Sequence, residues 1–178
     1  MTCMSDEQQD AEYVQVYVAA YPDAAEEIHT IRDTLRYELA LDNYAPSNAH
    51  ITVFPLVRVK RSDIPVIEAT VRMLGLVGRP ITIQGAGIWP NLKNPRVLLL
   101  DCDINLQSER QQLKSLFECL DVDTPRSPTP PHITLLKTES ARSMDSTTKE
   151  NLVQRIGEHR NTWKTTIKYV DIVVKDDA

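Results

Sequence analysis

The same order of sequence patterns occurs twice in this chain, and the two copies lie 82 residues apart. Each copy has a strand-like apolar stretch, a helical apolar face, a loop with proline, and a histidine that opens another strand-like stretch. The gapless offset pairs Val16 with Leu98, Ile31 with Leu113, Pro46 with Pro128 and His50 with His132. Apolar residues often match by chance, but a strand, a helix, a proline and a histidine in one register rarely do. We therefore expect a duplicated chain.

The first copy predicts a strand, a helix and a second strand in turn. Residues 14–18 alternate between apolar and polar, which is typical of a half-buried strand. Asp23 and Glu26 then resemble a helix N-cap pair. A turn-prone loop, 42–48, leads to the second strand at 49–54. The apolar face of the helix consists of Ile28, Ile31, Leu35 and Leu39.

The second copy repeats this plan. Residues 97–100 predict a buried strand, and the proline-rich loop 124–131 precedes another strand at 132–136. The helix between them has an apolar face of Leu106, Leu113, Phe117 and Leu120. Beyond the two copies we expect helices at 64–74 and 146–158 and strands at 80–86 and 165–174.

These elements favour an α+β fold over a parallel, doubly wound sheet, because no series of βαβ units with glycine-rich turns is present. We expect two antiparallel sheets, flanked by helices, that form two lobes around a central cleft. A pseudo-twofold axis would relate the lobes. The whole chain, 1–178, is predicted to be one domain, with a flexible N-terminus at 1–12 and repeat halves at about 13–79 and 80–178.

Composition limits the possible partners. The 178 residues are 42% hydrophobic and 25% charged, as in ordinary globular proteins. The net charge of −5 argues against broad binding to nucleic acid, but a few local cations can still hold a nucleotide or an RNA end. The three cysteines, Cys3, Cys102 and Cys119, lack CxxC spacing and are interpreted as reduced thiols. With no signal peptide or membrane span evident, we expect a cytoplasmic monomer that binds no membrane.

The functional signal is a pair of motifs, His50-Ile51-Thr52-Val53 and His132-Ile133-Thr134-Leu135. In a strand, a histidine and a threonine two residues apart share one face, at a spacing of roughly 7 Å, while the residue between them faces the core. Two lobes related by a twofold axis would bring both His and Thr pairs to one groove.

This constellation suits cleavage of a phosphodiester, above all a cyclic one. One neutral imidazole can accept a proton from the attacking water, while the other, protonated, donates to the departing oxygen. The two hydroxyls can donate to the phosphoryl oxygens. The candidate catalytic residues are therefore His50 and His132, and the candidate substrate-binding residues are Thr52 and Thr134. The scheme needs neither a metal nor a cofactor.

A single H-x-T on a strand is usually structural, and its recurrence at equivalent positions is what indicates function. His29, on the predicted helix, and His159, in a charged stretch, lack this context and are interpreted as surface or packing residues. Trp89 could stack on a base, but packing against the sheet is the favoured interpretation. A metal site built on the motif histidines has little support, because no carboxylate or thiol lies at ligand spacing from either.

With two such motifs, the sequence resembles the 2H phosphoesterase superfamily. Within it, the chain is most similar to the bacterial and archaeal RNA 2′,3′-cyclic phosphodiesterases, also known as 2′-5′ RNA ligases. The likeness covers most of the chain and includes 16–22, 81–90, 95–100 and 131–137, besides the first motif. It implies a bilobal, pseudo-symmetric fold and the hydrolysis of 2′,3′-cyclic phosphates of RNA or nucleosides.

The resemblance also implies roles for individual residues. His50 would be the proton donor and His132 the acceptor, although near-symmetry would let these roles exchange with the orientation of the substrate. Thr52 and Thr134 would bind the phosphate. Lys137 stands where many relatives carry Arg. Lysine keeps the positive charge but loses the bidentate geometry of arginine.

Several substrates stay open within this class. The cyclic phosphate end of an RNA, a small cyclic nucleotide, and a 2′-5′ or cyclic oligonucleotide signal all fit two histidines and two threonines. Some phage-encoded relatives degrade the last kind, which would be an anti-immune role. From another class, the chain could be a catalytically silent nucleotide-binding module.

Overall fold

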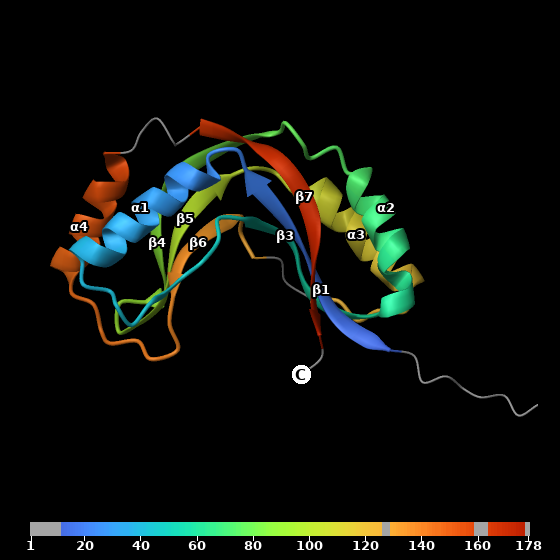
Figure 1. Cartoon of the computed structure of the whole chain (residues 1–178), viewed down its shortest axis with the longest axis horizontal. Coiled ribbons are helices and arrows are strands. Elements are labelled where there is room, and N and C mark those ends of the chain that lie inside the picture. Colours follow the sequence, from blue (N-terminus) through green and yellow to red (C-terminus); the bar gives the residue numbers. More distant parts are fainter. Residues whose placement is uncertain (1–11, 126–128, 159–163, 177–178) are drawn as a thin grey trace, which may run out of the picture.

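Seven strands and four α-helices make up the described part of the protein, a computed structural model in which residues 12–125, 129–158 and 164–176 are described (Figure 1). The order is β1 (Tyr13–Pro22), α1 (Ala25–Glu38), β2 (Ala45–Pro46), β3 (Ile51–Lys60), α2 (Ile64–Arg72), β4 (Pro80–Asn91), β5 (Asn94–Asp103), α3 (Gln107–Cys119), β6 (His132–Lys137), α4 (Ser146–Gly157) and β7 (Lys164–Asp176). The predicted α+β class is confirmed. Of the N-terminus expected to be flexible, 1–11 lie outside the described residues, as does His159.

All seven strands belong to one antiparallel sheet rather than to the two that we expected. Their order is β2-β6-β3-β1-β7-β4-β5, and a further pairing of β5 with β6 closes the sheet on itself. Two groups, β3-β1-β7 and β4-β5-β6, pair over long stretches. Between the groups, the described strands pair at one position of β3 with β6 and at three of β4 with β7. In two separate sheets, the edge strands would have unpaired backbone N–H and C=O groups. The links between the groups provide partners for these strands.

The register at the two links repeats the offset seen in the sequence. Ile51 pairs with Ile133, and Thr82 pairs with Lys164, so that in both pairs the partners are 82 residues apart. The helices α1 and α3 also begin 82 residues apart, as do α2 and α4. Where antiparallel strands pair a residue with its own counterpart, a local twofold axis passes between them. The duplication itself stays a prediction. The two strand pairs agree with it, because each joins positions that the 82-residue offset makes equivalent.

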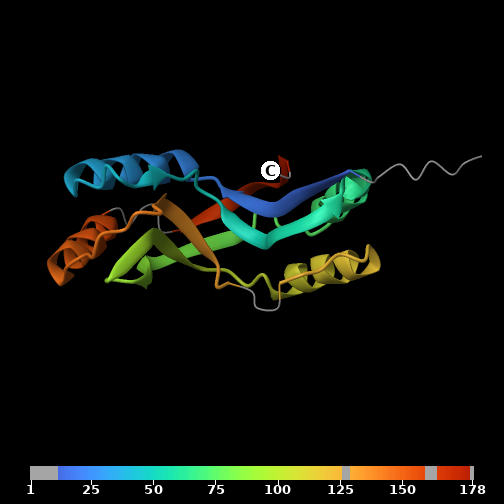
Figure 2. The ribbon, with the colours of Figure 1, turned by 90° about the horizontal axis from the view of Figure 1, so that it is seen from below.

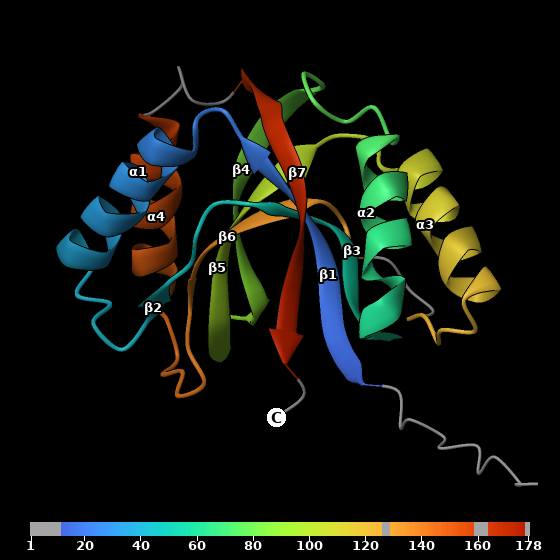
Figure 3. The same cartoon turned by 45° about the vertical axis from the view of Figure 1, so that its right-hand side comes forward.

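The helices pack in two pairs, α1 with α4 and α2 with α3, on either side of the strands (Figures 1 and 3). The view from below shows one pair at each end of the molecule (Figure 2). As the helical spacing predicted, α1 buries Ile28, Ile31 and Leu35, and α3 buries Leu113 and Phe117. Each pair combines one helix from each of the two predicted halves, 13–79 and 80–178.

The start of α1 differs from the prediction, because Asp23 and Glu26 do not cap it. The N-cap residue is Ala24, whose side chain makes no capping hydrogen bond. Its backbone N–H donates instead to Oγ1 of Thr165 on β7, at 3.1 Å. Because β1 continues to Pro22 in pairing with β7, the neighbouring strand supplies the acceptor that the local pair was expected to supply.

Two of the three cysteines lie in the described part of the chain, and both are free thiols. Cys102 is buried, and burial raises the pKa of its thiol to about 12, whereas Cys119 is exposed. None of the described helices is both long enough and apolar enough to cross a bilayer.

We predict that Ile51→Ala and Ile133→Ala each lower the free energy of unfolding by about 2–5 kcal/mol, because each removes a fully buried side chain at the link between β3 and β6. Denaturant unfolding followed by circular dichroism measures this. Val153→Ala, on an exposed position of α4, is the control and should change the value by less than about 0.5 kcal/mol. Equally small losses in all three variants would contradict the importance of the link.

Candidate active site

The two motifs lie side by side in the sheet, on β3 and β6. The paired residues Ile51 and Ile133 are both fully buried, so their neighbours along each strand face the opposite side. His50 and Thr52 flank Ile51, and the equivalent pair flanks Ile133; all four side chains are half-buried. The residues predicted to form the site therefore meet across a single point of strand pairing.

Both imidazoles are held in the same way. Nδ1 of His50 lies 2.9 Å from the carbonyl oxygen of Asn48, and Nδ1 of His132 lies 2.8 Å from that of Pro130. A carbonyl oxygen can only accept, so in each ring Nδ1–H donates to the backbone two residues earlier. This fixes the tautomer of the neutral ring and leaves Nε2 free to accept or donate a proton.

The surroundings of His50 favour its neutral form. Burial lowers the pKa of its imidazole, and positive charge on His132, Lys137 and Lys175 lowers it further, while the hydrogen bond to Asn48 acts in the opposite direction. The pairing of Ile51 with Ile133 places the backbones of the two histidines on neighbouring strands, beside the same strand contact.

Aromatic side chains surround the first motif. The ring centroids of Tyr17 and Tyr21 lie 5.8 Å and 6.1 Å from that of His50. Tyr21 in turn stacks on Tyr169 of β7, at 4.4 Å. Our sequence analysis missed these tyrosines, although the period of two along β1 could have found two of them. Tyr17 and Tyr21 alternate with buried residues, two positions either side of Ala19, which pairs with Thr52.

The second motif opens into a pocket of about 390 Å³. His132 and Thr134 line it together with Trp89 of β4 and Asp101 of β5. The indole of Trp89 is 60% exposed, so our expectation that it packs against the sheet is wrong. Trp89 pairs with Val97 near the end of the β4–β5 hairpin, and its side chain lines the pocket instead of the core. It is free to stack on a planar ligand.

His29 does more than the packing that we expected. Its Nε2 accepts a hydrogen bond from the backbone N–H of Ala49, at 2.8 Å. One turn further along α1, Arg32 donates to the carbonyl oxygen of Ser47 at 2.6 Å. Burial, followed by the charge of Arg32, lowers the pKa of His29 and so keeps Nε2 able to accept. α1 thus holds the loop that delivers His50, through contacts that the sequence pattern did not reveal.

Among the described residues, no cluster of three or more His, Cys, Asp or Glu side chains could hold a metal ion. Two arginines of the basic run 58–61 make contacts away from the motifs. Arg58 lies over the ring of Tyr13, 4.3 Å from its centroid, and Arg61 forms ion pairs with Glu12 and Asp176.

The sequence matches no protein-family model and no curated protein. The fold, in contrast, matches solved structures over most of the chain. E. coli LigT complexed with 3′-AMP is 18% identical, with 94% of this chain and 91% of that chain covered and a TM-score of 0.62. TT0787 of Thermus thermophilus is 15% identical, with 89% and 84% covered and a TM-score of 0.59.

Usb1 of Kluyveromyces marxianus, solved with uridine monophosphate, is 11% identical, with 93% of this chain and 97% of that chain covered and a TM-score of 0.51. This chain therefore shares the fold of all three proteins over most of its length. The resemblance predicted from the two motifs is therefore confirmed at the level of the fold.

We predict that the His50 imidazole titrates below its ordinary pKa of 6.5, because burial and nearby cations disfavour its protonated form. An NMR titration of the ring protons measures this. Lys137→Met and Lys175→Met should each raise the pKa, whereas Lys149→Met, on α4, is the control and should leave it unchanged. A pKa at or above the ordinary value would contradict the electrostatic description of the site.

Proposed function

We propose that this protein is a metal-independent phosphodiesterase that hydrolyses a 2′,3′-cyclic phosphate of RNA or of a nucleotide. His50 and His132 act as general base and acid, and Thr52 and Thr134 bind the phosphate. The observation that carries the proposal is the pairing of Ile51 with Ile133, because it brings two identically held imidazoles to one place.

The reaction follows from the state of the two rings. A neutral imidazole accepts a proton from water at Nε2 while the water oxygen attacks phosphorus. The bond from phosphorus to one ribose oxygen breaks, and the protonated imidazole donates its Nε2 proton to that oxygen. The product is a phosphomonoester. The threonine hydroxyls donate to the non-bridging oxygens, where negative charge builds up in the transition state.

The lowered pKa of His50 favours one assignment of the general base and the general acid. His50, held neutral, suits the acceptor, and His132 is then the donor. The resemblance implied the reverse order. Because the two motifs are nearly symmetric, the reverse assignment would require the substrate to lie in the opposite direction between them.

The pocket beside His132 supports a nucleotide as the substrate. Its volume of about 390 Å³ lies in the range of small-ligand sites. Trp89 offers an exposed aromatic face for a base, and the Asp101 carboxylate can accept hydrogen bonds from base N–H groups. LigT has been solved with phosphate and with 3′-AMP, and Usb1 with uridine monophosphate, which agrees with a nucleotide site on this fold.

We predict that His50→Ala and His132→Ala each lower kcat on 2′,3′-cyclic nucleotides by about 10²–10⁴, since a general acid or base typically contributes that much. Thymidine 3′-(p-nitrophenyl phosphate) separates the roles, because its leaving group departs without a proton. On that ester His132→Ala should lose far less activity, while His50→Ala should lose as much as before.

The same free energy of unfolding in both variants and wild type serves as the control for folding. Unchanged turnover in both variants would refute the mechanism. Rescue of His50→Ala instead of His132→Ala by the activated ester would reverse the two roles. The acid limb of kcat/KM should also lie below the ordinary histidine value, because the base must be neutral and its pKa is lowered.

We predict that Trp89→Ala raises KM for cyclic nucleotides by roughly 5- to 150-fold, because base–aromatic stacking contributes ~1–3 kcal/mol. Steady-state kinetics on 2′,3′-cyclic AMP measures it. Tyr37→Ala removes an exposed aromatic side chain from α1 and is the matched control, for which no change is expected. An unaltered KM for Trp89→Ala would place the base elsewhere.

A further inference from the structure

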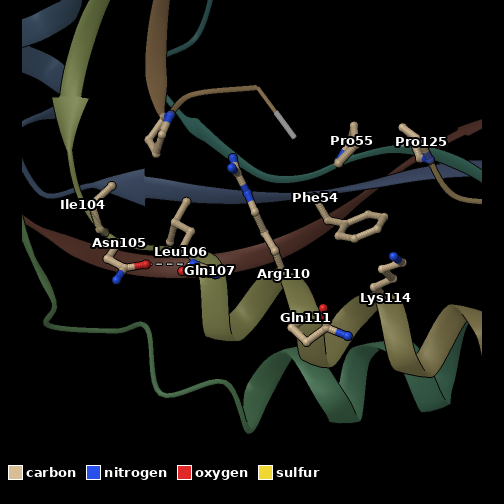
Figure 4. A pocket seen from close by; sticks show the side chains of 11 residues that line it. Phe54, Pro55, Ile104, Asn105, Leu106, Gln107, Arg110, Gln111, Lys114 and Pro125 are labelled. Carbon is tan, nitrogen blue, oxygen red and sulfur yellow. Dashed lines mark hydrogen bonds between the residues drawn. The ribbon is translucent and has the colours of Figure 1, made fainter. Parts of the chain in front are cut away.

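A second pocket, of about 490 Å³, adjoins the motif strands and takes no part in the proposed chemistry (Figure 4). Phe54 and Pro55 of β3 form one wall, and Arg110 and Lys114 of α3 form another. Pro131, which directly precedes His132, also lines it. The pocket therefore begins within one or two residues of both motifs.

The lining of this pocket is positive. It contains two cations and, among the described residues, no carboxylate, although the chain as a whole has a net charge of −5. The side-chain amides of Asn105, Gln107 and Gln111 add neutral hydrogen-bond donors. A local site of this kind on an acidic protein favours an anionic ligand.

Arg110 is the central group of the pocket. Its Nε donates to the carbonyl oxygen of Val53 at 2.9 Å, and its Nη2 donates to that of Thr52 at 3.3 Å. These carbonyls lie at a bulge, because β1 pairs Val18 with Phe54 and Ala19 with Thr52, which leaves Val53 without a partner there. The guanidinium thus fastens α3 to the first motif strand.

The charge of Arg110 is not neutralised by these contacts. Its side chain is half-buried, burial lowers the pKa of the guanidinium, and no described carboxylate forms an ion pair with it. Nη1 has no hydrogen-bond partner among the described residues. Lys114 has a single described ion pair, a long one of 3.9 Å to Glu118 on the exposed face of α3. A half-buried cation with unused donors is stabilised by an anion from outside.

We propose that this pocket binds a second phosphate group of the substrate, so that the preferred substrate is an oligonucleotide with an internal phosphodiester rather than a cyclic mononucleotide. The inference rests on the proposed function, and it selects among the substrates left open by the sequence. Arg110 binds the backbone of Thr52, whose hydroxyl holds the reacting phosphate. A nucleotide chain that continues along β3 from that phosphate enters the pocket next.

Kinetics on substrates of different length test the inference. We compare kcat/KM for 2′,3′-cyclic AMP with that for a triadenylate ending in a 2′,3′-cyclic phosphate. The wild type should prefer the trinucleotide by about tenfold or more, since a hydrogen bond to a charged group contributes ~1.5–3 kcal/mol. Lys114→Ala should lower this preference by about fivefold, as expected for a partly exposed charge. Lys149→Ala removes the same charge from α4 and should leave it unchanged.

Arg110→Gln provides a second variant, because its amide can still donate to the bulge carbonyls while the positive charge is lost. It should lower the preference for the trinucleotide more than Lys114→Ala does. Denaturant unfolding of each variant separates a loss of binding from a loss of folding. Equal use of the two substrates by the wild type, or a preference that neither variant alters, would overturn the inference.

A binding experiment decides the question without turnover. Calorimetry compares wild type and Lys114→Ala with three probes: an all-deoxy triadenylate, deoxyadenosine monophosphate and inorganic phosphate. The inference expects tighter binding of the trinucleotide, and loss of that advantage in Lys114→Ala. If inorganic phosphate bound as tightly and depended equally on Lys114, the pocket would serve free phosphate and the oligonucleotide inference would fall. If binding followed the inference while no cyclic phosphate was hydrolysed, the pocket would stand and the proposed function would fall.

Discussion

One backbone pairing, between Ile51 of β3 and Ile133 of β6, is the constraint on which the candidate site depends. Antiparallel strands that meet at a single position bring together the residues immediately beside it, and in both strands those residues are a histidine and a threonine. Burial of the two isoleucines determines which face the polar side chains occupy. A slip of one residue in either strand would turn a histidine into the core and an isoleucine out of it. The burial of the two isoleucines therefore also determines where the histidines lie.

Around this symmetric centre the surroundings differ. The backbone holds both imidazoles alike, through a carbonyl two residues earlier. Tyr17 and Tyr21 approach the first ring, whereas an exposed tryptophan and an aspartate share a pocket with the second. Equivalent backbone contacts hold the two imidazoles, whereas different side chains surround them. A symmetric site would bind a nucleotide equally well in two orientations. The candidate site is not symmetric, because different side chains surround its two histidines.

Much of the fold and the site followed from local pattern. Apolar spacing located the helices, the period of two located the strands, and the recurrence of His-x-Thr singled out the four residues that the structure brings together. What pattern could not supply depends on partners distant in sequence. The closure of one sheet from two groups requires edge pairings such as Thr82 with Lys164, which no local signal encodes. The hydrogen bond from Ala49 to His29, and that from Arg110 to the bulge at Val53, likewise join separate segments.

The closed sheet has a consequence for how the chain reaches this state. β1 obtains one of its two neighbours from β7, and the pairing of Val14 with Asp176 joins positions near opposite ends of the described chain. A chain emerging from the ribosome must therefore keep the apolar strand β1 half-paired until β7 has been synthesised. Such distant pairings form slowly, because loop closure precedes the contacts that offset its entropy. The sheet is then completed only when β7 pairs with β1, and a polypeptide interrupted before β7 exposes an unpaired strand edge to other chains.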